Sequence, residues 1–184
     1  MSEIKKLSLL YSKEKIDIKI TELAEEISKS YNSREPIIIG VLNGSFIFLA
    51  DLIRKLSISC TLDFIKVSSY SGLLSTGKVE LVKDISIDIK NRHVILVEDI
   101  IDSGTTIKFL RKHLMNFVPR SFSIVTLLKR QKTANLDFPI DFIGFEVKEE
   151  FVVGFGLDFA QKYRNLGAIY TLNQYFKKNE LERG

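Results

Sequence analysis

Apolar residues recur along the chain in two patterns, one with helical spacing and one as short continuous runs. Ser12 can cap a first helix, and Ile16, Ile20, Leu23 and Ile27 then follow at spacings of four, three and four. Such spacing places the four side chains on one face of a helix. A helix is therefore predicted from about residue 13, with one face turned towards a core.

Continuous apolar runs predict strands that are buried on both faces. PIIIGVL at Pro36–Leu42 and VILV at Val94–Val97 are the clearest of these runs. Further strands are predicted at 59–69, 123–128, 142–146 and 152–156, and helices at 46–56 and over the face Ile107, Leu110, Leu114 and Phe117. The strand–helix alternation predicts an α/β fold with a mostly parallel, twisted sheet flanked by helices.

No repeat, low-complexity tract or Pro/Gly-rich linker interrupts the 184 residues, which contain only three prolines. One continuous domain over residues 1–184 is therefore the simplest expectation. Residues 70–91 are rich in Gly, Ser, Thr and Lys and are predicted to form a long loop with room for a short hairpin.

The composition bounds the class of protein. Apolar residues make up 45% and charged residues 27%, and the net charge is +4. This charge suits an anionic small substrate but is too small to argue for nucleic-acid binding. The single cysteine, Cys60, cannot form an internal disulfide, and its apolar surroundings favour a buried side chain over a nucleophile. The amino terminus lacks a signal-peptide h-region, and polar residues 43–45 interrupt the longest apolar run. A cytoplasmic protein without a membrane span is expected.

Ligands of open parallel sheets bind beyond the carboxyl ends of the strands, so the polar residues at those ends are the candidates for a site. The stretch VILVEDIIDSGTT at 94–106 carries three acids and a turn of Gly and hydroxyl residues. A turn of this kind before a helix can hold a phosphate, although ordinary helix capping explains the turn equally well. Glu98 and Asp99 would repel a phosphate but can accept hydrogen bonds from the hydroxyls of a sugar. A ribose 5-phosphate fits both features better than a pair of solvated acids does.

VILVEDIIDSGTT closely resembles the phosphoribosyl-diphosphate signature of the purine phosphoribosyltransferases, in particular the hypoxanthine-guanine group. Four further segments resemble family motifs in the same order: LNGS from Leu42, SSYSGLLSTGKVEL from Ser68, LLKR from Leu127 and FVVGFGLDFAQKYRNL from Phe151. The resemblance covers nearly the whole chain and implies the type I, Rossmann-like fold with a small hood built from the terminal segments. Many members have Lys where this chain has Asn43, which removes one possible charge contact.

The resemblance implies a role for each matched residue. The ribose phosphate is expected to bind at Glu98, Asp99, Asp102, Ser103, Gly104, Thr105 and Thr106. The diphosphate is expected at Asn43, Gly44 and Arg164, and the purine at Lys129, Phe151, Val152 and Asp158. A mobile lid over about 70–91 would begin at Ser69 and Tyr70, and Mg²⁺ would be held by Asp158, Glu98 and Asp99. Homodimers or homotetramers are also implied.

The implied reaction joins a purine to 5-phosphoribosyl 1-diphosphate and releases diphosphate. Asp102 is the candidate general base, although it could instead order its own turn. Lys129 has donors only, so it suits the O6 of hypoxanthine or guanine and opposes adenine, whereas a Lys-Arg pair after a strand is more often solvated. Asp158 could otherwise cap a helix, and Arg164 could otherwise be a surface charge.

Two other classes of protein share parts of this pattern. A non-catalytic regulator of the same fold would keep VEDIIDSGTT but need a nucleic-acid-binding module or a concentrated basic face, and none remains unassigned. A phosphoacceptor receiver domain needs its acids on separate strands, whereas EDIID lies on one.

Overall fold

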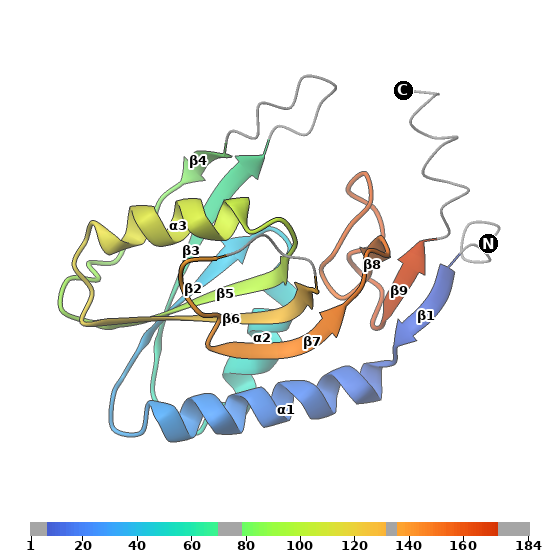
Figure 1. Cartoon of the computed structure of the whole chain (residues 1–184). Coiled ribbons are helices and arrows are strands. Elements are labelled where there is room, and N and C mark those ends of the chain that lie inside the picture. The colour runs from blue at the N-terminus through green and yellow to red at the C-terminus, as the bar shows by residue number, and fades with distance from the viewer. Residues whose placement is uncertain (1–6, 70–78, 132–135, 173–184) are drawn as a thin grey trace.

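The computed structural model describes residues 7–69, 79–131 and 136–172. Its centre is a six-stranded sheet with the order β4-β3-β2-β5-β6-β7. The strands are β2 (Ile37–Leu42), β3 (Thr61–Ser69), β4 (Val79–Lys83), β5 (His93–Ile101), β6 (Ser121–Arg130) and β7 (Phe142–Val147). All neighbours are parallel except β3 and β4 (Figure 1). The predicted mostly parallel α/β sheet is confirmed.

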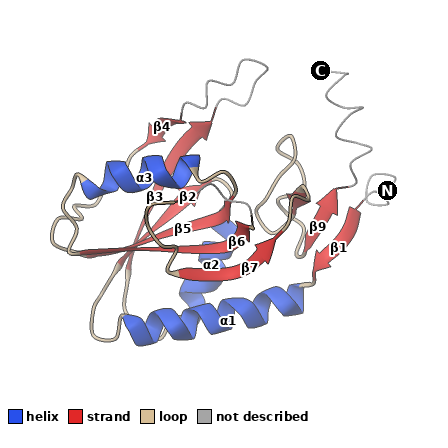
Figure 2. Ribbon diagram, viewed as in Figure 1, coloured by secondary structure: helices blue, strands red, loops and turns tan. Residues whose placement is uncertain are grey.

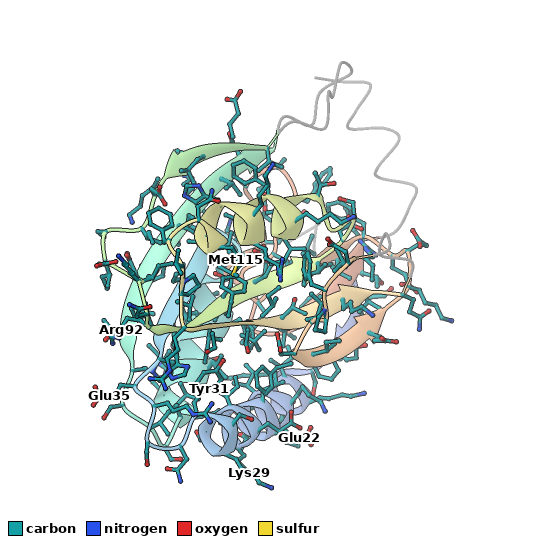
Figure 3. All side chains as sticks on the ribbon, turned by 60° about the vertical axis from the view of Figure 1, so that its left-hand side comes forward. Glu22, Lys29, Tyr31, Glu35, Arg92 and Met115 are labelled. Atoms are coloured by element: carbon teal, nitrogen blue, oxygen red, sulfur yellow. The ribbon has the colours of Figure 1, made fainter. Side chains whose placement is uncertain are left out.

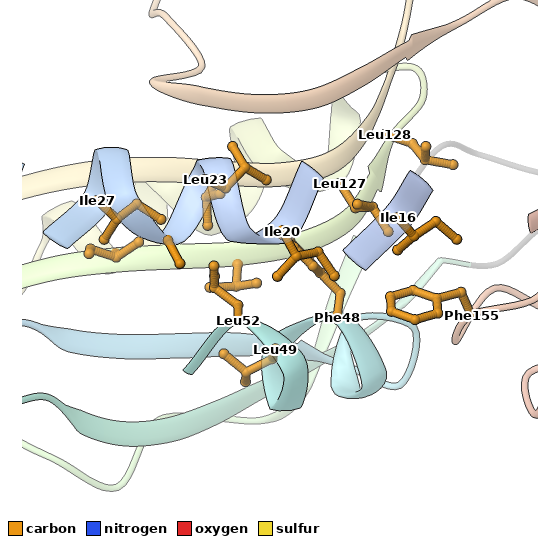
Figure 4. Packing of buried hydrophobic residues seen from close by; sticks show 14 of the residues in the cluster. Ile16, Ile20, Leu23, Ile27, Phe48, Leu49, Leu52, Leu127, Leu128 and Phe155 are labelled. Carbon is orange, nitrogen blue, oxygen red and sulfur yellow. The ribbon is translucent and has the colours of Figure 1, made fainter. Parts of the chain in front are cut away.

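Two helices cover one face of this sheet. These are α1 (Lys13–Ser30) and α2 (Phe46–Lys55), which lie below the sheet in Figure 1. Ser12 caps α1 by accepting a hydrogen bond from the amide of Lys15, as predicted. The predicted apolar face of α1 is buried against Phe48, Leu52 and Leu127 (Figure 4). Fully burying an Ile or Leu side chain contributes about 1.5–3 kcal/mol, so this layer anchors the sheet.

The other face is covered by α3 (Thr105–Met115). Its buried residues Ile107, Leu110 and Leu114 pack with Ile39 of β2 and with Ile89. The helix ends at Met115, so Phe117, which was expected to extend the apolar face, lies beyond it and is 38% exposed.

A second, three-stranded antiparallel sheet has the order β1-β9-β8. It joins β1 (Leu7–Tyr11) to β8 (Val152–Val153) and β9 (Ile169–Leu172), so the two ends of the described chain meet in it (Figure 2). This sheet is the predicted hood, and the carboxyl ends of β5, β6 and β7 point towards it. The strands β1 and β9 were not predicted, because a short half-exposed strand has little pattern of its own.

The structure corrects the predicted extent of the lid. Residues 79–83 are a strand paired with β3, and the side chain of Ile89 is fully buried. The next turn is held by Asp63, whose carboxylate accepts hydrogen bonds from the amides of Ser86 and Ile87. The segment from 79 to 91 is therefore anchored to the sheet. Tyr70 and the remainder of the predicted lid up to residue 78 lie outside the described residues.

Within the described ranges, no helix is long and apolar enough to cross a membrane.

Candidate active site

The two adjacent acids lie inside β5 and not after it, because the strand runs on to Ile101. The Glu98 atom Oε2 is buried and has no hydrogen-bond partner, and Asp99 is 7% exposed. Burial raises the pKa of Glu98 well above its ordinary value, and the charge of Asp99 and a hydrogen bond with it add to the rise. Burial also raises the pKa of Asp99, while the hydrogen bond with Glu98 and the charge of Arg164 oppose that rise. The pair is therefore a site that favours a bound proton or cation.

The turn after β5 closes around a small cavity of about 80 Å³. Glu98, Asp102, Ser103, Gly104 and Thr106 all line it, together with apolar residues 100, 101 and 107. Gly104 has a φ of 82°, a left-handed conformation that glycine adopts without strain. The Ser103 hydroxyl accepts a hydrogen bond from the amide of Thr105 at 3.3 Å and donates one to the Thr105 hydroxyl at 3.1 Å. The predicted phosphate turn is therefore a concave turn at the amino end of α3.

Asn43 and Gly44 form the turn between β2 and α2, and the peptide bond between Leu42 and Asn43 is cis. A Cβ atom on Gly44 would lie 1.9 Å from the Asp99 carboxylate oxygen Oδ2. A Cβ atom on Gly156, whose φ is +98°, would lie 2.2 Å from the carbonyl oxygen of Gly44. Only glycines allow the three segments to approach so closely, which brings the predicted diphosphate loop against the acids of β5.

Arg164 lies in the segment that begins at Phe151 and contacts Gly156, the residue that approaches Gly44. Its Nη1 donates to the carbonyl oxygen of Gly156 at 2.7 Å, and its Nη2 lies 2.7 Å from the Asp158 carboxylate. Asp158 also accepts a hydrogen bond from the amide of Gln161 at 2.8 Å. Between Asp158 and Leu172, where the described part ends, there is no helix, so the alternative of a helix cap is wrong. The segment instead folds as consecutive turns with positive φ at Ala160, Gln161 and Tyr163.

The carboxyl end of β6 supplies two basic residues with different environments. Lys129 pairs with Glu146 of β7 at 3.3 Å, and the Glu146 side chain is 53% exposed. An exposed pair of this kind contributes little energy, so the ammonium group can readily exchange Glu146 for a ligand. Arg130 is buried, in contrast to the solvated corner expected of a Lys-Arg pair.

The buried guanidinium of Arg130 ties three elements together. Its Nε donates to Asp102 Oδ1 at 3.1 Å, and its Nη1 donates to the carbonyl oxygens of Lys148 and Glu150. The carboxylate of Asp102 is thereby oriented by Arg130, although its side chain is 71% exposed. The same contacts fix the backbone that leads into Phe151.

Phe151 directly precedes β8 of the hood, and Val152 is the first residue of that strand. The ring of Phe151 meets that of Phe159 edge to face, with centroids 5.5 Å apart, and Val152 is buried in β8. The hydrogen bond from the amide of Leu172 to the Phe151 carbonyl fixes this part of the hood. A flat aromatic ligand could stack on Phe151, whose orientation is set by these contacts.

The carboxylates of Glu98, Asp99 and Asp158 fit a Mg²⁺ site in part. Within 7–69, 79–131 and 136–172 no three His, Cys, Asp or Glu side chains gather as a ligand group, so Asp158 does not join Glu98 and Asp99 in one cluster. Mg²⁺ is commonly held by one or two carboxylates together with substrate phosphates, and it prefers oxygen ligands. The unpartnered Oε2 of Glu98 and the pair Asp158–Arg164 offer such partial ligation.

Comparison with known proteins decides the family. Residues 7–160 match the model of the phosphoribosyl transferase domain. The chain belongs to this family.

Relatives and solved structures agree with the family assignment. The chain is 45% identical to hypoxanthine phosphoribosyltransferase of Buchnera aphidicola, over 89% of this chain and 94% of the relative. It is 42% identical to hypoxanthine-guanine phosphoribosyltransferase of Aquifex aeolicus, over 94% and 99%. A hypoxanthine-guanine phosphoribosyltransferase structure from Bacillus anthracis superimposes with a TM-score of 0.85 at 43% identity, covering 90% of this chain and 98% of that one.

The sequence did not indicate three residues that shape this phosphoribosyl transferase site. Arg130 and Gly156 lay in segments that resemble family motifs but were assigned no role, and Glu146 was not considered. For Gly156 a signal existed, since an isolated glycine beside a strand often marks a close approach of two backbones. The pairings of Arg130 and Glu146 depend on strand neighbours and had no local signal.

Proposed function

We propose that this phosphoribosyl transferase moves the 5-phosphoribosyl group of 5-phosphoribosyl 1-diphosphate to N9 of hypoxanthine or guanine and releases diphosphate. One observation carries the proposal: Asp99 packs against Gly44, while Glu98 and Asp102 line the cavity of the turn after β5. Acids that can bind sugar hydroxyls thus lie between two turns that can bind phosphates. The names of the relatives agree with this substrate class.

The roles of the residues follow from that placement. The turn 103–106 binds the 5-phosphate through its amides and hydroxyls, and Glu98 and Asp99 accept hydrogen bonds from the ribose. Asn43, Gly44 and Arg164 bind the diphosphate, for which a guanidinium offers a planar fork of donors. Arg164 must then share its contacts between the diphosphate and Asp158.

The purine would lie between β6 and the hood. Phe151 stacks on the ring, Val152 contacts it through the backbone, and Lys129 donates to O6 after leaving Glu146. As the bond from C1 to the diphosphate breaks, positive charge develops on the sugar, and the nearby carboxylates stabilise it. Asp102, held by Arg130, accepts the proton that the purine loses.

Mg²⁺ would neutralise the charge of the leaving diphosphate. Its candidate protein ligands are Asp158 on the one hand and Glu98 with Asp99 on the other, in each case together with oxygens of the substrate. Ser69 and Tyr70 begin the proposed lid, which remains a prediction because Tyr70 and the following residues lie outside the described part. We also propose one domain over 1–184 and a cytoplasmic location. We further propose a homodimer or homotetramer, and light scattering would measure this oligomeric state.

A spectrophotometric assay tests the activity. Purified protein is incubated with the sugar diphosphate and hypoxanthine, guanine, xanthine or adenine, with and without Mg²⁺. Nucleotide is expected from hypoxanthine or guanine, and only with Mg²⁺. The absence of product from every 6-oxopurine, with a folded protein, would contradict the proposal.

The variant Lys129→Gln tests the purine site. Glutamine can both donate and accept, so it no longer opposes the amino group of adenine, and the ratio of kcat/KM for hypoxanthine to that for adenine should fall by roughly 10-fold or more. Glu146→Gln is the matched control, because it releases Lys129 without changing it. If Lys129→Gln still excludes adenine completely, discrimination resides elsewhere.

A further inference from the structure

A large polar cavity lies at the amino ends of the central strands, at the opposite end of the sheet from the proposed active site. Its volume is about 1090 Å³, and it is formed by the segments 32–35, 57–59 and 91–93 with Arg120. These segments directly precede or begin β2, β3, β5 and β6. Since these strands are parallel, the cavity collects their amino ends, whereas the candidate active site collects their carboxyl ends.

Positive charge dominates the lining of this cavity. Arg34, Arg92 and Arg120 line it, and Glu35 is the one acid among the lining residues. Arg92 donates to the main-chain carbonyl of Glu35 at 3.4 Å and not to its carboxylate. In the described part of the chain none of the three arginines has a carboxylate within ion-pair distance, so their charges are not neutralised by the protein. Arg92 and Glu35 lie near Tyr31 at one edge of the molecule in Figure 3.

His93 lines the same cavity as the three arginines. Burial lowers its pKa, and the charges of Arg120, Arg34 and Arg92 lower it further. The three guanidinium groups come from three separate loops, yet the charge of each lowers the pKa of the same imidazole. The Nδ1 atom of His93 lies 2.7 Å from the Ser121 hydroxyl, a contact that orients the ring.

The rest of the lining is polar and uncharged. Asn32, Ser33, Ser57, Ser59 and Asn91 offer amides and hydroxyls around the arginines. Pockets for small molecules commonly measure about 300–1,000 Å³, so the cavity has room for more than a single phosphate. Each guanidinium can bind a phosphate with two parallel hydrogen bonds.

We propose that this arginine cavity is a second binding site, which takes a small anion with two or more adjacent phosphate groups. Three guanidiniums that line one cavity without carboxylate partners are complementary to such a charge-dense ligand. Nucleic acid fits less well, because the site is concave and local and the net charge of the chain is only +4.

The site is separate from the proposed active site. His93 begins β5, and Glu98 to Ile101 end it, so the full length of a nine-residue strand separates the cavity from the turn at 102–106. At about 3.3 Å per residue that distance is on the order of 25 Å. Anion binding here therefore does not require the sugar-diphosphate site to be vacant or filled.

The two histidines of the chain allow a direct test. The ring signals of His93 and His113 are followed by NMR against pH, with inorganic tripolyphosphate or with NaCl at equal ionic strength. Bound tripolyphosphate should raise the pKa of His93 by at least ~0.5 unit beyond the effect of NaCl. His113, which pairs with Asp84 on the α3 side, serves as an internal reference.

A double variant ties the effect to the cavity. Arg34→Ser/Arg120→Ser removes two exposed guanidiniums and keeps the hydrogen bond from Arg92 to the Glu35 carbonyl. It should weaken tripolyphosphate binding at least ~10-fold. Lys13→Ser/Lys19→Ser, in the first two turns of α1, removes the same net charge far from the cavity and should leave binding unchanged. Circular dichroism confirms that both variants are folded.

Each result of these binding experiments either supports the second site or contradicts it. Tighter binding of a nucleoside triphosphate than of tripolyphosphate would support the site and add a nucleoside to its ligand, and equal binding would support recognition of the phosphates alone. A His93 response that NaCl reproduces, or that survives in Arg34→Ser/Arg120→Ser, would overturn the proposal.

Discussion

Glu98 and Asp99 are adjacent acids in a buried strand, and their burial destabilises the protein when no ligand is bound. The pKa of each is raised in the folded state, so folding at neutral pH requires either proton uptake or a buried charge. A sugar or a cation would relieve this cost on binding. Residues that destabilise the free protein are therefore the ones proposed to hold the substrate, which is a common trade-off between stability and activity.

The variant Glu98→Gln tests that cost. A carboxyl with a raised folded pKa stabilises the protein most below its ordinary pKa, near 4.5, and this contribution is lost as pH rises towards the folded pKa. Glutamine removes the loss, so the free energy of unfolding at pH 7 should rise by on the order of 1 kcal/mol, while the gain disappears near pH 4. Urea unfolding at both pH values measures this, with exposed Glu25→Gln as control. An equal gain at both pH values would contradict the electrostatic cause.

The variant Asp102→Asn separates catalysis from positioning. Asparagine keeps an oxygen for the hydrogen bond from Arg130 but cannot take a proton. Turnover should fall by a factor on the order of 10² or more, while KM for the sugar diphosphate changes little. Ser103→Ala provides a comparison, because it alters the phosphate turn and should act mainly on KM. Unchanged turnover in Asp102→Asn would remove Asp102 as the base.

At the scale of elements, local patterns predicted the long helices and the central strands well. The face of α1 and the runs of β2 and β5 were recognisable because each repeats one signal over many residues. β8 was predicted, although it is shorter than expected, whereas β1 and β9 were missed because each is short and they pair with each other across nearly the whole sequence. The segment 70–91 was predicted as a long loop with room for a short hairpin, and the antiparallel pairing of β4 with β3 agrees with the hairpin. The anchoring of residues 84–91 became visible only with the sheet in place.

The variant Asp63→Asn tests that attachment. Burial alone would raise the pKa of Asp63, but hydrogen bonds from the amides of Ser86, Phe64 and Ile87 outweigh it and hold the pKa below its ordinary value. This stabilisation is present above the ordinary pKa, near 3.8, and is lost as pH falls through the lower folded value. Asparagine cannot accept all these bonds, so unfolding at pH 7 should become easier by about 1–3 kcal/mol.

Hydrogen exchange provides the sharper measurement for Asp63→Asn. The amides of Ser86 and Ile87 should exchange much faster, whereas those of α1 should change only with global stability. Asp137→Asn, at an exposed position, is the matched control. Retained protection at 86 and 87 would show that the strand pairing of β4 holds the segment without Asp63.

At the scale of the whole molecule, substrate binding should raise thermal stability. A ligand that binds only the folded protein adds about 2.7 kcal/mol at 100 times its Kd, and 1 kcal/mol corresponds to about 2–4 °C for a chain of this size. Sugar diphosphate with Mg²⁺ should therefore raise Tm by roughly 5–10 °C. The rise should be much smaller without Mg²⁺, and calorimetry would measure it. Equal shifts with and without Mg²⁺ would contradict a metal-assisted site.

The sequence alone determined the element types and the chemistry at the strand ends, because apolar periodicity, glycine turns and acidic residues are local features of the chain. It could not determine which charges meet. The contact of Arg130 with Asp102, the approach of Gly44 to Asp99 and the convergence of Arg34, Arg92 and Arg120 all join segments far apart in the sequence. Only the order of the strands in the sheet brings these residues together, and this order depends on the packing of the entire core.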